Sequence, residues 1–203
     1  MLSESKLAQG VADLASRDGD LAAVVAAHGS PPLWSRKPGF PTLVQIILEQ
    51  QVSLASAKAA FENLIGSLEE ITPEALLALN DGELRAIGFS RQKARYCRVV
   101  SQAIVDGEID MEGLSRLSDA KARKALTSLV GIGRWTADIY LLMALHRPDI
   151  WPKGDLALAK AAQQVKGLEE LPDQDQLEEL AESWQPWRAV AARILWLHYL
   201  SRG

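Results

Sequence analysis

Apolar residues recur every three or four positions along nearly the whole chain, which is the spacing of one face of an α-helix. Alanine and leucine dominate these segments, and no stretch shows the sustained alternation of β-branched residues that marks a strand. The pattern predicts an all-α fold. A chain of 203 residues is long enough to bury a sizeable core, either as one domain or as two helical lobes.

Capping residues mark several of the expected helix ends. Thr72 followed by Pro73 is a typical helix start, because threonine caps the first turn and proline fits the first helical position. We expect Asp81 to cap a short helix that stops at Gly88. Two more helices are expected after serine caps, from Ser90 to about Asp106 and from Ser118 to about Leu129.

Two prolines are expected to open further helices. Pro41 begins a helix that is predicted to continue through Gln51 toward Leu64, and Pro186 begins the last helix of the chain. The connection between residues 148 and 154 is the most irregular in the second half. Irregular connections between helices are common places for functional sites.

The cysteine content and the hydropathy pattern exclude several classes of protein. Cys97 is the only cysteine, so an intramolecular disulfide and a four-cysteine zinc or iron–sulfur site are excluded. No run of some eighteen apolar residues occurs, and the N-terminal residues lack the apolar stretch of a signal peptide. We therefore expect an unprocessed cytoplasmic protein without a membrane segment.

The charge of the chain is unevenly distributed. The formal net charge is −4, which argues against a generic nucleic-acid binder. Residues 85–147 nevertheless hold 11 Lys/Arg against 6 Asp/Glu, and much of the remaining negative charge lies between residues 169 and 182. Such an asymmetry permits a DNA-facing side, although a basic helix face is usually just solvated.

The segment from Leu129 to Ala137, LVGIGRWTA, lies between two helical patterns. Its glycines, Gly131 and Gly133, allow a tight turn with positive φ and the close approach of another backbone. Amides of such a turn, together with the N-terminus of the next helix, can bind an anion, and this would let an acidic chain hold DNA. A bare Gly-x-Gly is also an ordinary corner between two helices.

About twenty residues later, the segment WPKGD places Asp155 between an irregular loop and an apolar helix. Aspartate is a favourable N-cap residue, and that role alone would explain it. A capping bond also fixes the carboxylate in place. The structural and a catalytic role of Asp155 are therefore compatible.

Tryptophan and glutamine supply the remaining signals. Six tryptophans beside three phenylalanines is a bias that suits stacking on an electron-poor base, although each tryptophan could equally pack in the core. Gln50 and Gln51 form a pair that, by itself, reads as the solvated face of a helix.

In combination, the segments IILEQQVS (residues 46–53), LVGIGRWTA and WPKGD, followed by Trp196, resemble the helix-hairpin-helix (HhH-GPD) DNA glycosylase superfamily. The match is best to its 3-methyladenine DNA glycosylase II branch, without that branch's amino-terminal β-rich domain. The resemblance implies two packed helical subdomains with a DNA-binding cleft between them. The hairpin subdomain would span about residues 68–148, and residues 1–67 with 149–203 would form the second.

The resemblance also implies roles for individual residues. Asp155 would be the catalytic carboxylate, and the base pocket would contain Trp135, Ile139 and Trp196, where Ile139 replaces a tyrosine of the best-known bacterial relative. Gln51 would be the wedge that fills the gap of the extruded nucleotide. The residues implied to contact DNA are Gln50, Gln51, Gly131, Gly133, Arg134 and Thr136. The backbone carbonyls implied to hold a Na⁺ or K⁺ ion are those of Thr127, Leu129 and Ile132.

Two absences define the expected chemistry. Bifunctional relatives carry a lysine two residues beyond the second hairpin glycine, where its amine forms a Schiff base. Here that position is Trp135, so we expect base excision without strand cleavage. The lack of a cysteine quartet removes the iron–sulfur branches, and we expect no organic cofactor.

These features predict a monofunctional DNA glycosylase that excises alkylated purines such as 3-methyladenine or 7-methylguanine from double-stranded DNA. Ethenoadenine and 1-methyladenine stay open as preferred bases. We expect a monomer in a bacterial cytoplasm, associated with the nucleoid. The alternative is a non-catalytic helix-hairpin-helix DNA-binding protein, which needs the hairpin but neither Asp155 nor Trp135. An α-helical interaction protein is a third possibility and predicts no DNA binding.

Overall fold

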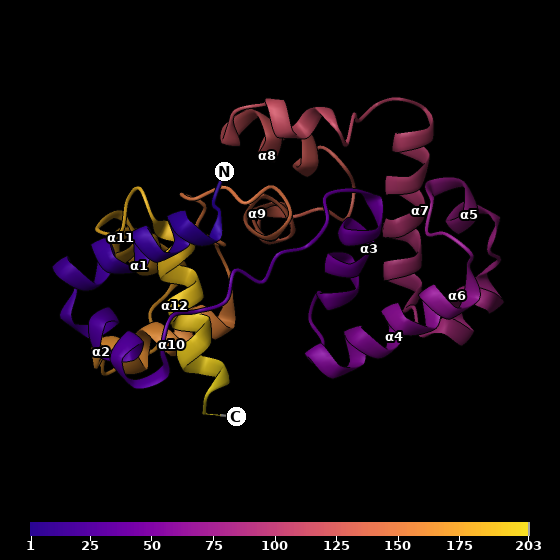
Figure 1. The fold of residues 1–203 in the computed structure, drawn as a ribbon. Helices are drawn as coiled ribbons and strands as arrows, with labels where there is room; N and C mark the ends of the chain where they lie inside the picture. The colour runs from indigo at the N-terminus through magenta and orange to yellow at the C-terminus, as the bar shows by residue number, and fades with distance from the viewer. Residues whose placement is uncertain (203) are drawn as a thin grey trace. The chain divides into compact units, whose positions relative to one another are not determined.

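The structure, a computed structural model, describes residues 1–202. Within this range it contains twelve α-helices, one short 3₁₀ helix and no strand, so the predicted all-α class is confirmed (Figure 1). The chain divides into two compact units. Residues 36–140 form the central unit, and residues 1–35 together with those from Leu141 onward form the terminal unit.

The terminal unit joins the two ends of the chain. Its helices are α1 (Glu4–Arg17), α2 (Gly19–His28), α10 (Leu156–Lys166), α11 (Gln174–Glu182) and α12 (Arg188–Leu200). Helix α12 packs against α1, α2, α10 and α11, so the indigo and the orange-to-yellow parts of Figure 1 lie side by side. Every residue from Ala189 to Trp196 is buried, as expected for a helix surrounded by neighbours.

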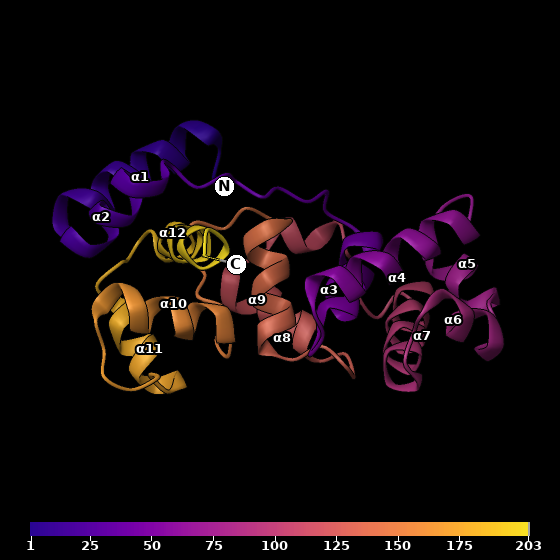
Figure 2. The ribbon, with the colours of Figure 1, turned by 90° about the horizontal axis from the view of Figure 1, so that it is seen from below.

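The central unit is built around α3, whose residues Leu43, Val44, Ile46 and Ile47 are completely buried. Helix α3 packs on α4 and α7, and α7 also packs on α5 and α6 (Figure 2). The helices that begin in this unit are α3 (Phe40–Glu49), α4 (Leu54–Ser67), α5 (Pro73–Ala78), α6 (Asp81–Ile87), α7 (Arg91–Val105), the 3₁₀ helix η1 (Gly113–Arg116), α8 (Asp119–Thr127) and α9 (Arg134–Met143).

Most of the predicted caps are confirmed. The side chains of Thr72, Ser90 and Ser118 each accept a backbone N–H in the first turn of α5, α7 and α8. Gly88 ends α6 in the left-handed region, with φ 111°. The prediction of Asp81 as the cap of α6 is wrong by one residue, because Asn80 caps this helix in a capping box with Glu83.

The predicted continuous helix from Pro41 toward Leu64 is wrong. Helix α3 ends at Glu49, and α4 begins at Leu54 after the cap Ser53, whose hydroxyl accepts the Ser56 amide at 3.2 Å. Gln51 lies in the turn between them with φ 55°, in the left-handed region that a helix cannot contain. The apolar pattern continues across this turn, so periodicity alone did not reveal the break.

Two other expected ends shift by two residues. Helix α12 begins at Arg188 rather than at Pro186, and α8 ends at Thr127 rather than near Leu129. The division into units also differs from the expected subdomain boundaries, because residues 36–67 belong to the same unit as the hairpin. The reason is packing, since α3 and α4 bury their apolar faces against α7 and α6.

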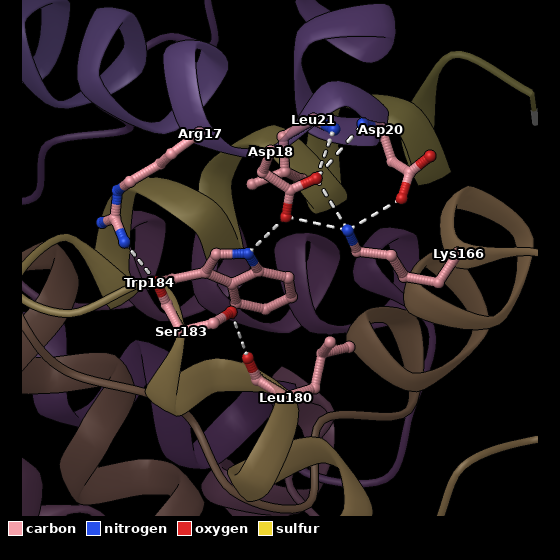
Figure 3. A network of polar contacts seen from close by, with 8 residues as sticks. All are labelled: Arg17, Asp18, Asp20, Leu21, Lys166, Leu180, Ser183 and Trp184. Carbon is pink, nitrogen blue, oxygen red and sulfur yellow. Dashed lines mark hydrogen bonds and ion pairs between the residues drawn. The ribbon is translucent and has the colours of Figure 1, made fainter.

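Asp18 organises the terminal unit (Figure 3). It ends α1 and caps α2, where its carboxylate accepts the Asp20 and Leu21 amides. The same carboxylate accepts the Lys166 ammonium at 2.7 and 2.8 Å and the Trp184 indole N–H at 2.7 Å. Burial raises the pKa of Asp18, but these bonds outweigh burial and hold it below its usual value of 3.8. One carboxylate thus ties α2 to the C-terminal end of α10 and to the segment after α11.

Between residues 1 and 202, no helix has the length and apolar character needed to cross a membrane.

Candidate functional site

Asp155 is the N-cap of α10, as its sequence context suggested. One of its oxygens, Oδ1, accepts the Leu158 amide at 2.9 Å and the Trp196 indole N–H at 3.3 Å. The carboxylate is therefore fixed both by the backbone of α10 and by an aromatic side chain of α12. The structure brings together two of the predicted site residues, Asp155 and Trp196, within the terminal unit.

The irregular loop before Asp155 is held by α11. The ammonium of Lys153 donates to Glu178 at 2.6 Å and to Asp175 at 3.0 Å, and these two hydrogen bonds raise its pKa above 10.5. Earlier in the loop, the buried Trp151 packs at 5.5 Å from the Trp184 ring. The negatively charged segment between residues 169 and 182 thus includes, on α11, the two carboxylates that bind the loop before Asp155.

In the hairpin, the two glycines have different environments. Gly131 has φ 97°, and a Cβ built there would overlap the Tyr96 ring of α7. Gly133 is exposed, lies outside the positive-φ region and would place a Cβ with no atom within 4 Å. The protein itself therefore requires glycine at 131 but leaves the space beside 133 open.

Gln50 connects the hairpin to the turn between α3 and α4. Its amide nitrogen donates to the Gly131 carbonyl at 3.0 Å and to the Thr136 hydroxyl at 2.8 Å. Thr136 is buried, so what it can offer to DNA is its backbone amide in the first turn of α9. Gln51, the predicted wedge, is exposed at the tip of this turn next to the 44 % exposed Val52.

The remaining predicted residues of the central unit lie on α9. Trp135 is half-buried in the first turn, and Ile139 is buried at 2 % exposure. Arg134 is half-exposed, and its guanidinium contacts the buried carboxylate of Asp138 at 3.4 Å. Asp138 also accepts Arg123 of α8 at 2.6 Å. Burial raises the pKa of Asp138 above its usual value of 3.8, although the two arginines oppose this shift.

The three carbonyls predicted to hold an ion lie at the end of α8 and in the hairpin. Thr127 is the last residue of α8, so its carbonyl has no partner one helical turn further on. The Leu129 carbonyl accepts the Ile132 amide at 3.0 Å, which closes the turn. Across residues 1–202, no group of three His, Cys, Asp or Glu side chains is placed to hold a metal.

Comparison with known proteins identifies the class. The family model of the HhH-GPD superfamily base excision DNA repair proteins matches residues 44–186, which is most of the chain. This protein therefore belongs to the HhH-GPD superfamily.

Among its relatives is the DNA-3-methyladenine glycosylase 1 of Schizosaccharomyces pombe, 28 % identical over 165 residues that cover 79 % of this chain and 72 % of the relative. The DNA-3-methyladenine glycosylase 2 of Escherichia coli is 29 % identical over 79 % of this chain. The chain spans 59 % of that relative and 64 % of a Bacillus subtilis relative that is 27 % identical to it over 87 % of this chain.

A solved structure of the S. pombe 3-methyladenine DNA glycosylase in complex with abasic DNA superposes with a TM-score of 0.86. The two are 27 % identical, and the match covers 93 % of this chain and 95 % of the other. A DNA-3-methyladenine glycosidase from Bacillus halodurans gives a TM-score of 0.75 at 26 % identity, over 100 % of this chain and 99 % of that one.

Sequence reasoning missed three residues that shape the site. Tyr96 covers Gly131, Asp138 holds the first residue of α9, and Trp34 packs against Trp196 with 6.4 Å between ring centroids. Tyr96 and Asp138 follow helical patterns that look like ordinary solvated faces. The bias toward tryptophan was a signal for Trp34, but no local motif singled it out.

Proposed function

We propose that this protein is a monofunctional DNA glycosylase that extrudes alkylated, cationic purines such as 3-methyladenine or 7-methylguanine from duplex DNA and hydrolyses their N-glycosidic bond. The observation that carries the proposal is the fixed carboxylate of Asp155, bonded to both Leu158 and the indole of Trp196. The relatives named as 3-methyladenine glycosylases support the same activity.

Asp155 would supply the electrostatic part of the mechanism. Loss of a base from deoxyribose passes through a state with positive charge on the sugar, which a carboxylate beside C1′ stabilises. The same carboxylate can orient the attacking water or accept its proton. A base alkylated at a ring nitrogen already carries positive charge, so it leaves without a strong general acid. One fixed aspartate therefore suffices.

Base selection would depend on the three residues proposed for the base pocket, which are Trp135, Ile139 and Trp196. The face of an indole attracts a cation by about 0.5 to 2 kcal/mol, which favours an alkylated purine over a neutral one. Trp135 occupies the position where lyase-active relatives carry lysine, and an indole nitrogen cannot form a Schiff base. We therefore propose base release without strand cleavage.

DNA would be held by the central unit. The amides around Gly133 and the first turn of α9 would bind a phosphate, with the half-exposed Arg134 beside them. The open space at Gly133 supports this role, because nothing within the protein itself fills it. The exposed Gln51 would enter the gap of the extruded nucleotide. Most of the basic segment between residues 85 and 147 lies in this unit, which favours contact with DNA. We also propose that the protein is a monomer in the cytoplasm, associated with the nucleoid.

We also propose that the carbonyls of Thr127, Leu129 and Ile132 hold a Na⁺ or K⁺ ion. Backbone carbonyls are hard oxygen ligands that suit such ions, and the C-terminal end of α8 carries partial negative charge. When bound, the ion would add positive charge next to the phosphate site. The residues of the hairpin would still make the phosphate contacts themselves.

The decisive experiment compares Asp155→Asn with the wild type on duplexes that contain 7-methylguanine or 3-methyladenine. Asparagine remains a good N-cap, so the fold should be kept, while base release under single-turnover conditions should fall by at least about 100-fold because the charge is lost. Affinity for an abasic-site duplex should stay near that of the wild type. Asp155→Ala serves as the control that removes both charge and cap.

The outcomes separate the candidate functions. A variant that released methylated bases at close to the wild-type rate would remove Asp155 from the chemistry. A wild-type protein that bound duplex DNA but released no base would be a non-catalytic DNA-binding protein. A wild-type protein that bound no DNA at all would exclude both DNA-dependent functions and leave the third possibility, an α-helical interaction protein.

A further inference from the structure

Trp34 has a backbone conformation that a large side chain rarely adopts. Its φ is 47°, in the left-handed region, and it lies between α2 and α3 in the terminal unit. Bulky residues occur there only when their surroundings hold them, and such residues cluster at functional sites.

The residues on both sides of Trp34 are clamped. The carbonyl of Leu33 accepts the Arg193 guanidinium at 2.9 Å, and the Ser35 hydroxyl is hydrogen-bonded to His146 at 2.8 Å. Arg193 is completely buried in α12, and its other two nitrogens donate to the carbonyls of Ala189 and Leu142. Burial lowers the pKa of Arg193 to about 10, so the burial of this charge is costly.

The clamp places the Trp34 ring against Trp196, the residue whose indole bonds the proposed catalytic carboxylate. The rings of Trp34 and Trp196 meet nearly edge to face, at 73° and 6.4 Å, and the Trp196 indole N–H donates to Asp155 at 3.3 Å. Trp196 is buried, with 8 % of its surface exposed, whereas Trp34 is half-buried. Of the two packed tryptophans, Trp34 is therefore the more accessible residue.

We infer that Trp34 is a specificity-determining residue that stacks on the extruded base, and that Trp196 supports it from behind. The inference rests on the proposed glycosylase function and assigns to Trp34 much of the stacking that the family resemblance gave to Trp196. The ligand is a flat, electron-poor purine whose positive charge the Trp34 face attracts. Arg193 and His146 are positioning residues, because they act through the backbone and the neighbour of Trp34.

The test measures single-turnover release of 7-methylguanine, a cation, and of hypoxanthine, a neutral base, by Trp34→Ala, Trp34→Phe and the wild type. Trp34→Ala should lose about tenfold more rate on 7-methylguanine than on hypoxanthine, which corresponds to about 1.4 kcal/mol of lost selective stacking. Trp34→Phe keeps a ring and should retain most of the rate. Affinity for an abasic-site duplex, which contains no base to stack on, should change less than about twofold.

Trp187→Phe is the matched control, because Trp187 also lies in the terminal unit but beside Gly10 of α1. It should release both bases at the wild-type rates. Equal losses on both bases, or a parallel loss of abasic-site affinity, would overturn the role of Trp34. If Trp34→Ala fails to fold, Trp34→Leu, which keeps an apolar side chain but no ring, replaces it and should show the same larger loss on 7-methylguanine. Wild-type protein and Asp155→Asn run in the same series, so a wild type that releases no base would refute the glycosylase proposal, and the stacking role with it.

Discussion

At the scale of single residues, the hairpin glycines are the clearest case in which structure separates two positions of the same motif. Gly131 combines positive φ with contact to Tyr96, so its glycine is explained within the protein. Gly133 has neither feature. No contact within the protein requires glycine at position 133, and under the proposed function the open space would admit a phosphate whose approach a Cβ would block.

This difference leads to opposite expectations for two alanine variants. Gly131→Ala should lower the free energy of unfolding by at least about 1 to 2 kcal/mol, because alanine is strained at φ 97° and its Cβ overlaps Tyr96. Gly133→Ala should fold like the wild type but bind abasic-site duplex at least about fivefold more weakly, a loss of roughly 1 kcal/mol. Urea melts and fluorescence anisotropy measure the two quantities.

Gly66→Ala is the control for both, since a Cβ at this position in α4 meets no atom within 4 Å. It should leave DNA affinity unchanged. Wild-type DNA affinity in Gly133→Ala would place the hairpin outside the interface.

Sequence reasoning reached the polar parts of the site more easily than the aromatic ones. The cap role of Asp155 was predictable, because aspartate before an apolar helix has few other local explanations. The conformation of Trp34 was not, because positive φ is expected at glycine or asparagine and nothing local marks a tryptophan for it. The clamp that holds it comes from Arg193, about 160 positions away.

At the scale of elements, the turn between α3 and α4 is joined to the hairpin by one side chain. Gln50 donates to Gly131 and Thr136, and the next residue is the proposed wedge, Gln51. A single amide thus couples the residue that would enter the DNA to the segment that would bind the phosphate.

Gln50→Leu should remove both hydrogen bonds and lower the free energy of unfolding by roughly 2 kcal/mol, at about 1 kcal/mol for each bond. Gln50→Glu should cost more, because a carboxylate cannot donate and its charge is repelled by the Gly131 carbonyl. Chemical denaturation measures both variants. Gln51→Ala is the neighbouring control and should melt like the wild type, since Gln51 is exposed. Equal stability of Gln50→Leu and wild type would show that the two Gln50 hydrogen bonds contribute little to the free energy of unfolding.

The element boundaries show where periodicity is reliable. The helices capped by Thr72, Ser90 and Ser118 were predicted because each of these residues is a local start signal. The break at Gln51 was missed although Ser53 is also a cap, because the apolar spacing continues through it. At the interruption, Gln50 contacts the hairpin about 80 positions later in the chain, and such a contact leaves no local signal in the sequence.

At the scale of the whole molecule, the carboxylate of Asp18 connects α1 and α2 to the end of α10 and to the segment after α11. The pKa of Asp18 is lowered in the folded state, so its contribution to stability is fully present above its unfolded value of 3.8. The contribution is lost as the pH falls through the lowered pKa. Lys166 has a raised pKa, so its share is complete below 10.5 and is lost only as the pH rises through that raised value.

As the pH falls below about 4, wild-type protein should therefore lose stability more steeply than Asp18→Asn. The amide of asparagine keeps the cap of α2 but cannot ionise, so that variant should start from a lower stability at pH 6 and show a flatter acid limb. Denaturant midpoints measured in steps of half a pH unit provide the comparison. Parallel acid limbs would mean that other carboxylates govern acid unfolding.

The double use of Asp155, as helix cap and as proposed catalyst, has an evolutionary consequence. A change of this residue to asparagine or serine would silence the chemistry while the start of α10 remained capped. The family fold therefore has a short mutational path from repair enzyme to inactive DNA-binding protein, with no poorly folded ancestor between them. Proteins that arose by this change would keep the hairpin and the helices and would differ from their active relatives at the carboxylate itself.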